Sequence, residues 1–138
     1  MENAYKETFD RFAIYLFASF LSPVLFAVCF SFYSQLIMEN SWTFLSMFIL
    51  AAIFTFPIFL VGVFPISLFI DFSKIGKSLS VWKKGICYAC SGGVIGCIAG
   101  IWVFGASEAF TYLLAAVYGI VGGLLHFFML FFLKRIFR

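Results

Sequence analysis

Charged residues are scarce in this chain. Asp, Glu, Lys and Arg make up 11% of its 138 residues, whereas they supply about a quarter of an ordinary soluble domain. Hydrophobic residues make up 64% of the chain, and the mean hydropathy is +1.12. A core of this size would leave much of that apolar surface in water. The composition therefore excludes a soluble domain of the usual kind.

Catalytic and cofactor-binding motifs are also missing. The sequence contains no HExxH helix, no GxSxG turn and no phosphate-binding loop, which are patterns that hold metals, nucleophiles or nucleotides. We therefore expect no enzyme activity and no cofactor. The bases are too few, and too scattered among apolar runs, to form a nucleic-acid surface. No nucleic acid is expected as a partner.

The cysteines do not form a predicted metal or redox site. Cys87, Cys90 and Cys97 share one face of a helical stretch at 100° per residue. Cys29 belongs to the far end of another apolar run. Zinc ligands must converge on one ion at about 2.3 Å, which these positions do not allow. We interpret all of them as structural thiols.

Basic residues are absent from two of the connections between apolar runs. The nine Lys and Arg residues fall in three stretches: Lys6 and Arg11, then Lys74, Lys77, Lys83 and Lys84, and finally Lys134, Arg135 and Arg138. The connections around Glu39 and Glu108 contain only acid. Because basic residues near span ends stay in the cytoplasm, this alternation predicts a multi-pass protein of the cell membrane with both termini cytoplasmic. The lipid bilayer is the first expected partner, and its anionic inner leaflet should attract the basic face.

Apolar runs of suitable length define the spans. About 20 apolar residues cross a hydrocarbon core of about 30 Å, which predicts spans at about 12–32, 42–64, 86–104 and 112–133. Short connections should pair them as antiparallel hairpins. The predicted fold is an all-α, integral membrane four-helix bundle of two antiparallel hairpins, forming a single transmembrane domain over 1–138.

The second apolar run is too long for one upright span. As a single helix, 42–70 would extend over about 43 Å. Pro57 should kink it, and the Thr55 hydroxyl should satisfy a carbonyl that the proline frees. Pro65 should then begin a separate helical piece, 65–72, along the inner interface.

Small residues recur every four positions in the third and fourth spans. They are Gly92, Gly96 and Gly100, followed by Ala115, Gly119 and Gly123. This spacing places small residues on one helix face and lets two backbones approach closely. In an antiparallel hairpin it predicts that Gly96 faces Gly123 and Gly100 faces Gly119. We interpret the two stripes as a seam within one chain, with a seam between copies of a homo-oligomer as the alternative.

His126, the only histidine, falls inside the fourth span and is the candidate intramembrane polar site. One interpretation is a neutral imidazole packed over glycine backbone and hydrogen-bonded to a carbonyl or hydroxyl. The other is a proton or ion relay. A relay needs a second buried titratable group, and we expect every Asp and Glu at or beyond a span end. This favours the packing interpretation.

The four-span layout and one stretch of the first span resemble a family of uncharacterised small membrane proteins from Bacillus-type bacteria. The stretch is Phe17-Ala18-Ser19-Phe20-Leu21-Ser22-Pro23. The resemblance implies a membrane location and no particular activity. Small multidrug transporters are similar in size, but they keep an acid in the first span, and residues 14–32 contain none. The polar and glycine signatures of fluoride channels are missing as well.

A set of spans with so little charge suits contact between helices better than passage of a solute. We therefore expect an accessory, regulatory or immunity-type protein that binds another membrane component. The alternative is a small oligomeric channel or transporter with His126 on its path.

Overall fold

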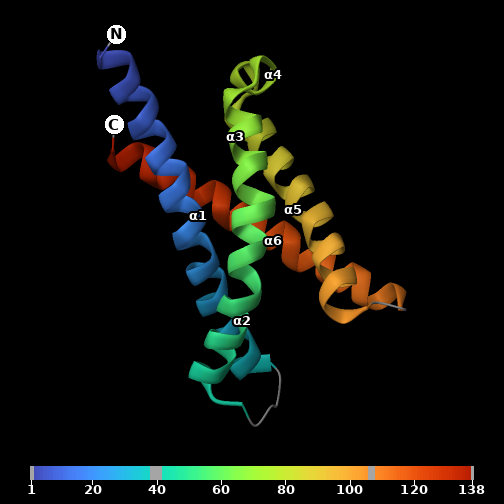
Figure 1. The fold of residues 1–138 in the computed structure, drawn as a ribbon. Helices are drawn as coiled ribbons and strands as arrows, with labels where there is room; N and C mark the ends of the chain where they lie inside the picture. The colour runs from blue at the N-terminus through green and yellow to red at the C-terminus, as the bar shows by residue number, and fades with distance from the viewer. Residues whose placement is uncertain (1, 38–41, 106–107, 138) are drawn as a thin grey trace.

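The computed structural model describes residues 2–37, 42–105 and 108–137. Met1, Glu39 and Arg138, which the topology prediction uses, lie outside these residues. The helical elements are α1 (Glu2–Ile37), α2 (Phe44–Ile58), the π-helix η1 (Phe59–Val63), α3 (Phe64–Phe72), α4 (Lys74–Ser78), α5 (Val81–Phe104) and α6 (Ala109–Ile136). The described ranges contain no strand, so the predicted all-α class is confirmed (Figure 1).

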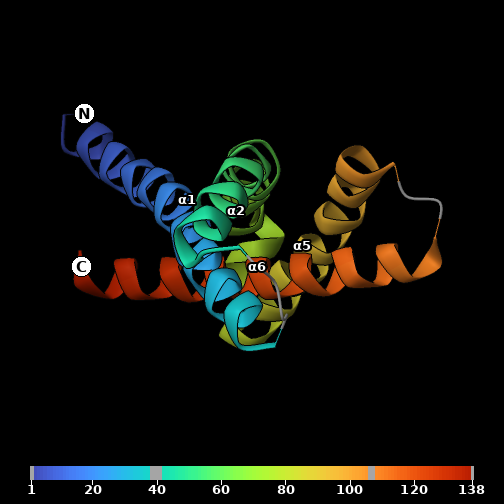
Figure 2. The same ribbon diagram turned by 90° about the horizontal axis from the view of Figure 1, so that it is seen from below.

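Four helical segments are long and apolar enough to cross a membrane: Phe9–Ile37, Phe44–Phe72, Val81–Val103 and Ala109–Ile136. They pack mainly as two hairpins, α1 with α2 and α5 with α6, and α6 also contacts α1. The predicted four-helix bundle is therefore confirmed. Figures 1 and 2 show that α6 runs across α1 and the α2–α3 segment rather than alongside them. The two hairpins thus cross each other.

The second span differs from its prediction. α2, η1 and α3 form one uninterrupted helical segment, so no separate interfacial helix begins at Pro65. After Pro57 the chain forms the π-helix η1, and short π-helical segments are common where the hydrogen bonds of an α-helix are interrupted. The Thr55 hydroxyl donates to the Ala51 carbonyl at 2.7 Å. The carbonyl that Pro57 frees is that of Ile53, four residues earlier, so the predicted role of Thr55 was wrong. Because the segment continues, it carries Asp71 into the bundle.

Proline is accommodated inside α1 as well. Pro23 has no backbone N–H to donate to the preceding turn, and its side chain is fully buried. In that turn, the Ser19 and Ser22 hydroxyls donate to the carbonyls of Tyr15 and Ala18 at 2.9 and 2.6 Å. Serines can turn inward here because their hydroxyls are satisfied within the helix.

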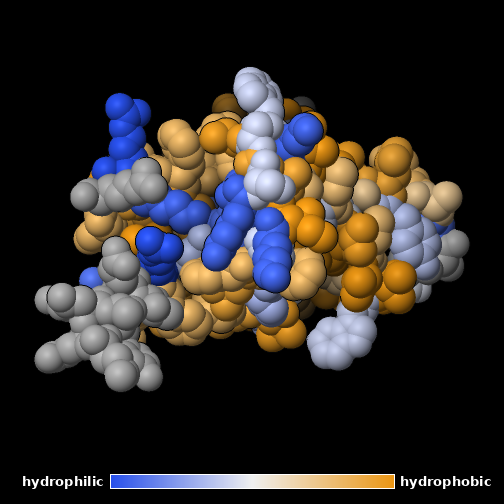
Figure 3. Space-filling view, turned by 90° about the horizontal axis from the view of Figure 1, so that it is seen from above, coloured by the Kyte–Doolittle hydropathy of each residue, from blue (hydrophilic) through white to orange (hydrophobic). Residues whose placement is uncertain are grey.

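The two ends of the bundle differ in charge. We call the end formed by the start of α1, by α3, α4 and the start of α5, and by the end of α6 the basic end, and the opposite one the acidic end. In the view onto the basic end, hydrophilic side chains extend across its middle, with apolar surface beside them (Figure 3). A buried cluster of Tyr15, Ala18, Tyr88, Leu130 and Leu133 lies in this half of the molecule. Polar and apolar groups are therefore packed together there.

Candidate functional site

Asp71, on the last turn of α3, is the centre of a polar cluster at the basic end. Its carboxylate oxygens lie 3.1 Å from Lys84 Nζ and 2.7 Å from Lys134 Nζ. The Asp71 side chain is only 7% exposed, whereas those of Lys84 and Lys134 are 24% and 40% exposed. A buried carboxylate is thus paired with two ammonium groups that also reach solvent. Their exposure limits the desolvation cost of bringing the three charges together.

Two tyrosines complete the cluster. The Tyr15 hydroxyl donates to Asp71 Oδ2 at 2.6 Å, and the Tyr88 hydroxyl lies 3.4 Å from the same oxygen and from the Ser67 carbonyl. Lys134 Nζ also lies 4.6 Å from the centre of the Tyr15 ring, within cation–π range. We call Asp71, Tyr15, Lys84, Tyr88 and Lys134 the Asp71 cluster. It takes members from α1, α3, α5 and α6 and so joins both hairpins.

This cluster was not predicted from the sequence. Every acid was expected at or beyond a span end, whereas the Asp71 carboxylate is buried. The reason is the continuous second span, which brings α3 between α1 and α5 instead of laying it along the interface. A signal was present, because Asp71 is the only charged residue in an apolar segment that extends from residue 42 to residue 72. Such a residue inside a span is expected to have a partner.

His126 lies deeper in the bundle and is completely buried. Its Nδ1 lies 2.9 Å from the Ser22 hydroxyl of α1, which also donates to the Ala18 carbonyl. A serine hydroxyl has one proton, and that of Ser22 is donated to the Ala18 carbonyl. The Ser22 oxygen therefore accepts from His126, which assigns the imidazole proton to Nδ1. His126 therefore ties α6 to α1 through a hydroxyl, which is the kind of contact that the packing interpretation requires.

The second ring nitrogen of His126 has no hydrogen-bond partner. Nε2 is buried, and no donor or acceptor of the described residues reaches it. The rings of Phe59 and Tyr88 lie with their centres 6.0 Å from that of the imidazole. Tyr88 thus contacts His126 with its ring and Asp71 with its hydroxyl. In the part of the chain that the structure describes, no hydrogen bond joins His126 to the Asp71 cluster, so the two polar groups are neighbours and not one network.

The small residues of α5 and α6 lie where these helices touch. A Cβ atom on Gly119 would be 2.1 Å from the Gly92 carbonyl oxygen, and one on Gly96 would be 2.3 Å from that of Ala115. A Cβ on Gly123 would likewise be 2.3 Å from the Tyr88 carbonyl oxygen. The backbones are therefore in direct contact at these positions, and the seam lies within one chain.

The register of this seam differs from its prediction by one helical turn. Gly96 lies against Gly119 instead of Gly123, and Gly100 lies against Ala115 instead of Gly119. The physical reason is the period of the two stripes. Because small residues repeat every four positions on both helices, a shift of one turn still places small residues opposite each other. The spacing alone cannot choose between the two registers.

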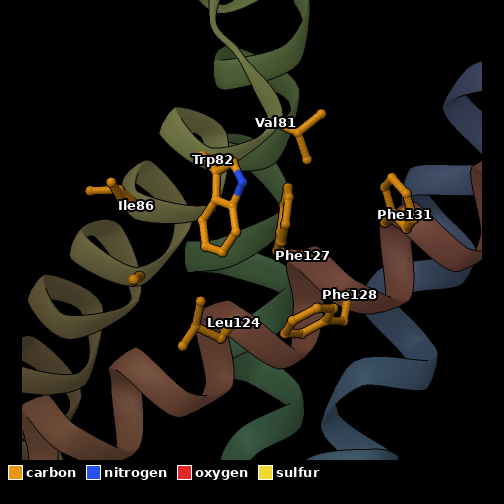
Figure 4. A pocket seen from close by; sticks show the side chains of 9 residues that line it. Val81, Trp82, Ile86, Leu124, Phe127, Phe128 and Phe131 are labelled. Atoms are coloured by element: carbon orange, nitrogen blue, oxygen red, sulfur yellow. The ribbon is translucent and has the colours of Figure 1, made fainter.

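Two apolar grooves open from the side of the bundle. The first, about 320 Å³, lies between α5 and α6 towards the basic end and is lined by residues that include Trp82, Ile86, Leu124, Phe127, Phe128 and Phe131 (Figure 4). The second, about 310 Å³, lies between α1 and α6 towards the acidic end and is lined by residues that include Phe26, Phe30, Tyr33, Leu114, Val117 and Tyr118. Both face outward, so a ligand would reach them from the bilayer.

The cysteines remain free thiols. In residues 2–37, 42–105 and 108–137, no group of three His, Cys, Asp or Glu side chains is arranged to hold a metal ion. No family model, curated protein or solved structure matches the chain.

Proposed function

We propose that this protein is a multi-pass component of the cell membrane, with its basic end and both termini in the cytoplasm. It is not an enzyme and has no nucleic-acid partner. Its role is accessory, regulatory or immunity-type, and it acts by binding another membrane component, either a different protein or a second copy of itself. The distribution of nine bases to one side and none to the other supports the orientation.

The observation that carries the binding role is the contrast between the interior and the sides of the bundle. Inside, Asp71 is neutralised by Lys84 and Lys134, and this cluster joins helices of both hairpins. At the sides, both grooves are lined by apolar and aromatic side chains. A solute-conducting protein needs a polar path, whereas lateral apolar grooves suit recognition within the bilayer.

A small oligomeric channel or transporter is the second candidate. The unpartnered Nε2 of His126 is the specific observation in its favour, because a buried polar atom without a partner is rare and a role in proton transfer is one explanation for it. Tyr88 lies between this imidazole and Asp71, which would give a path towards the basic end.

Flux measurements separate the two candidates. Purified protein in liposomes should conduct neither protons nor small ions above the level of empty liposomes. Ser31→Ala is a matched control for His126→Ala, because Ser31 is also completely buried and its hydroxyl has one hydrogen bond within the described ranges, to the Ala27 carbonyl of its own helix. A flux that His126→Ala abolishes and Ser31→Ala preserves would reverse the ranking.

A cross-linking scan tests the binding role directly. Photoreactive residues at Val61, Val94 and Val117, all exposed and each on a different span, should be introduced singly in cells. The proposal predicts one discrete cross-linked product of fixed mass from one face and none from the others. Absence of any discrete product from every exposed face would contradict it.

A further inference from the structure

We propose that the groove between α5 and α6 binds an anionic phospholipid of the cytoplasmic leaflet. One acyl chain lies in the groove, and the phosphate is held by Arg135 at its rim. The inference rests on the orientation proposed above, which places the basic end in the cytoplasm.

The groove has the size and lining that a hydrocarbon chain requires. It follows α5 from Val81 to Ala89, about 12 Å at 1.5 Å per residue, which approaches the thickness of one leaflet's hydrocarbon, about 15 Å. Figure 4 shows the Trp82 ring projecting towards Leu124, with Phe127 beside it. The length and lining of the groove suit one extended acyl chain.

Neighbouring bases on the two groove helices have different surroundings. On α5, Lys84 pairs with Asp71, whereas the preceding Lys83 is exposed and has no ion pair within the described ranges. On α6, Lys134 pairs with Asp71, whereas Arg135 is exposed and likewise unpaired there. Each helix thus supplies one base to the interior and one to the outside. The outer pair has no counter-ion within the described part of the protein.

Of the two free bases, Arg135 is the one at the rim of the groove. At 100° per residue, Arg135 lies within about 40° of Phe128 and Phe131, which line the groove one and two turns deeper. On α5, the Trp82 indole lines the groove and is of the type that settles at lipid headgroups, whereas Lys83 lies about 100° around the helix from Trp82. Long basic side chains can reach along such a surface towards a phosphate, and a guanidinium binds phosphate with two parallel hydrogen bonds. An anionic headgroup supplies the missing counter-charge.

Quenching of Trp82 fluorescence by brominated lipids tests this proposal. In a Trp42→Phe/Trp102→Phe variant, Trp82 is the only tryptophan, and the protein is placed in phosphatidylcholine nanodiscs with added brominated phosphatidylglycerol or brominated phosphatidylcholine. Half-maximal quenching of Trp82 should need a several-fold lower mole fraction of brominated phosphatidylglycerol than of brominated phosphatidylcholine. One contributing base is expected to give a difference of roughly fivefold. Arg135→Gln should remove this preference. The matched control is Lys77→Gln, which removes the same charge from an exposed position of α4 at the same end.

Each other outcome overturns the proposal. Equal quenching by the two lipids, or an equal loss of preference in the α4 control, would show that only the surface potential acts. No quenching by either lipid would show that protein covers the groove. Labelling of the basic end from outside intact cells, with the lipid preference retained, would instead overturn the orientation and leave the groove's lipid chemistry in place.

Discussion

At the scale of single residues, Asp71 has the largest role in this structure. Its carboxylate is 7% exposed and forms ion pairs with two lysines and hydrogen bonds with two tyrosines. These four residues belong to three other helices. A buried carboxylate without its cations would be strongly destabilising. The cluster therefore specifies which helices meet at the basic end.

Asp71→Asn should destabilise the protein by about 1–3 kcal/mol. This cost lies below the range of about 3–5 kcal/mol for a broken, fully buried pair, because Lys84 and Lys134 are partly exposed and can turn to water. Asp10→Asn is the control, since Asp10 is exposed and forms no ion pair in the described part of the chain. Unfolding in mixed detergent measures both variants. Equal stability of the two would show that the cluster contributes nothing to the fold.

The contact between Ser22 and His126 should appear as a coupling energy. A double-mutant cycle of Ser22→Ala and His126→Gln should give about 0.6 kcal/mol, and at most about 1.7 kcal/mol, the range for hydrogen bonds between membrane helices. The same cycle with Ser31→Ala in place of Ser22→Ala should give no coupling energy, because the Ser31 hydroxyl donates to a carbonyl of its own helix. The packing interpretation also predicts that His126→Gln folds normally and that His126→Phe does not. An imidazole that titrates between about pH 5 and 8 by NMR would support the relay instead.

At the scale of helices, the α5–α6 seam depends on backbone contact. Glycines on both helices approach so closely that a methyl group on either side would meet a carbonyl oxygen of the other. Overlap with a backbone atom cannot be relieved by a rotamer change, whereas overlap with a flexible side chain can. Glycines within α5 and α6 therefore differ in their tolerance of alanine.

Gly119→Ala should cost about 1–3 kcal/mol more than Gly93→Ala. A Cβ on Gly119 would be 2.1 Å from the Gly92 oxygen, whereas one on Gly93 would be 3.1 Å from Cγ1 of the Ile120 side chain. Both variants gain the same helix propensity, so their difference reports the clash. It can be measured as the shift in unfolding midpoint in detergent.

Cross-linking tests the register and the single-chain seam together. In a background without native cysteine, Gly100→Cys with Ala115→Cys should form a disulfide within the monomer, because these positions are in contact. Gly100→Cys with Gly119→Cys should form one less readily. A disulfide that appears only between chains would place the seam in a homo-oligomer and contradict the structure.

The elements show what the sequence can and cannot predict. Span number and helical class follow from apolar run length, which is a local property. The Asp71 cluster combines residues from four distant segments, and the partner of His126 depends on how the two hairpins dock. A four-residue repeat leaves the α5–α6 register undetermined. Local patterns therefore fixed the elements, whereas long-range contacts decided the site.

At the scale of the whole molecule, the two hairpins cross and are joined at the basic end (Figure 1). Helices that cross separate on either side of the crossing point, so side chains leave lateral grooves there. Both grooves border α6, the helix that runs across the others. The shape thus presents apolar hollows to the bilayer and keeps its buried charge at one end.

Cysteine accessibility in intact cells tests the central claim, that the basic end faces the cytoplasm and that four spans separate it from the acidic connections. Single cysteines replace Glu39, Lys77, Glu108 or Arg138 in a background without native cysteine, and cells are treated with a maleimide that cannot cross the membrane. The account predicts immediate labelling at 39 and 108, and labelling at 77 and 138 only after the cells are permeabilised. Labelling at 77 or 138 in intact cells would contradict it.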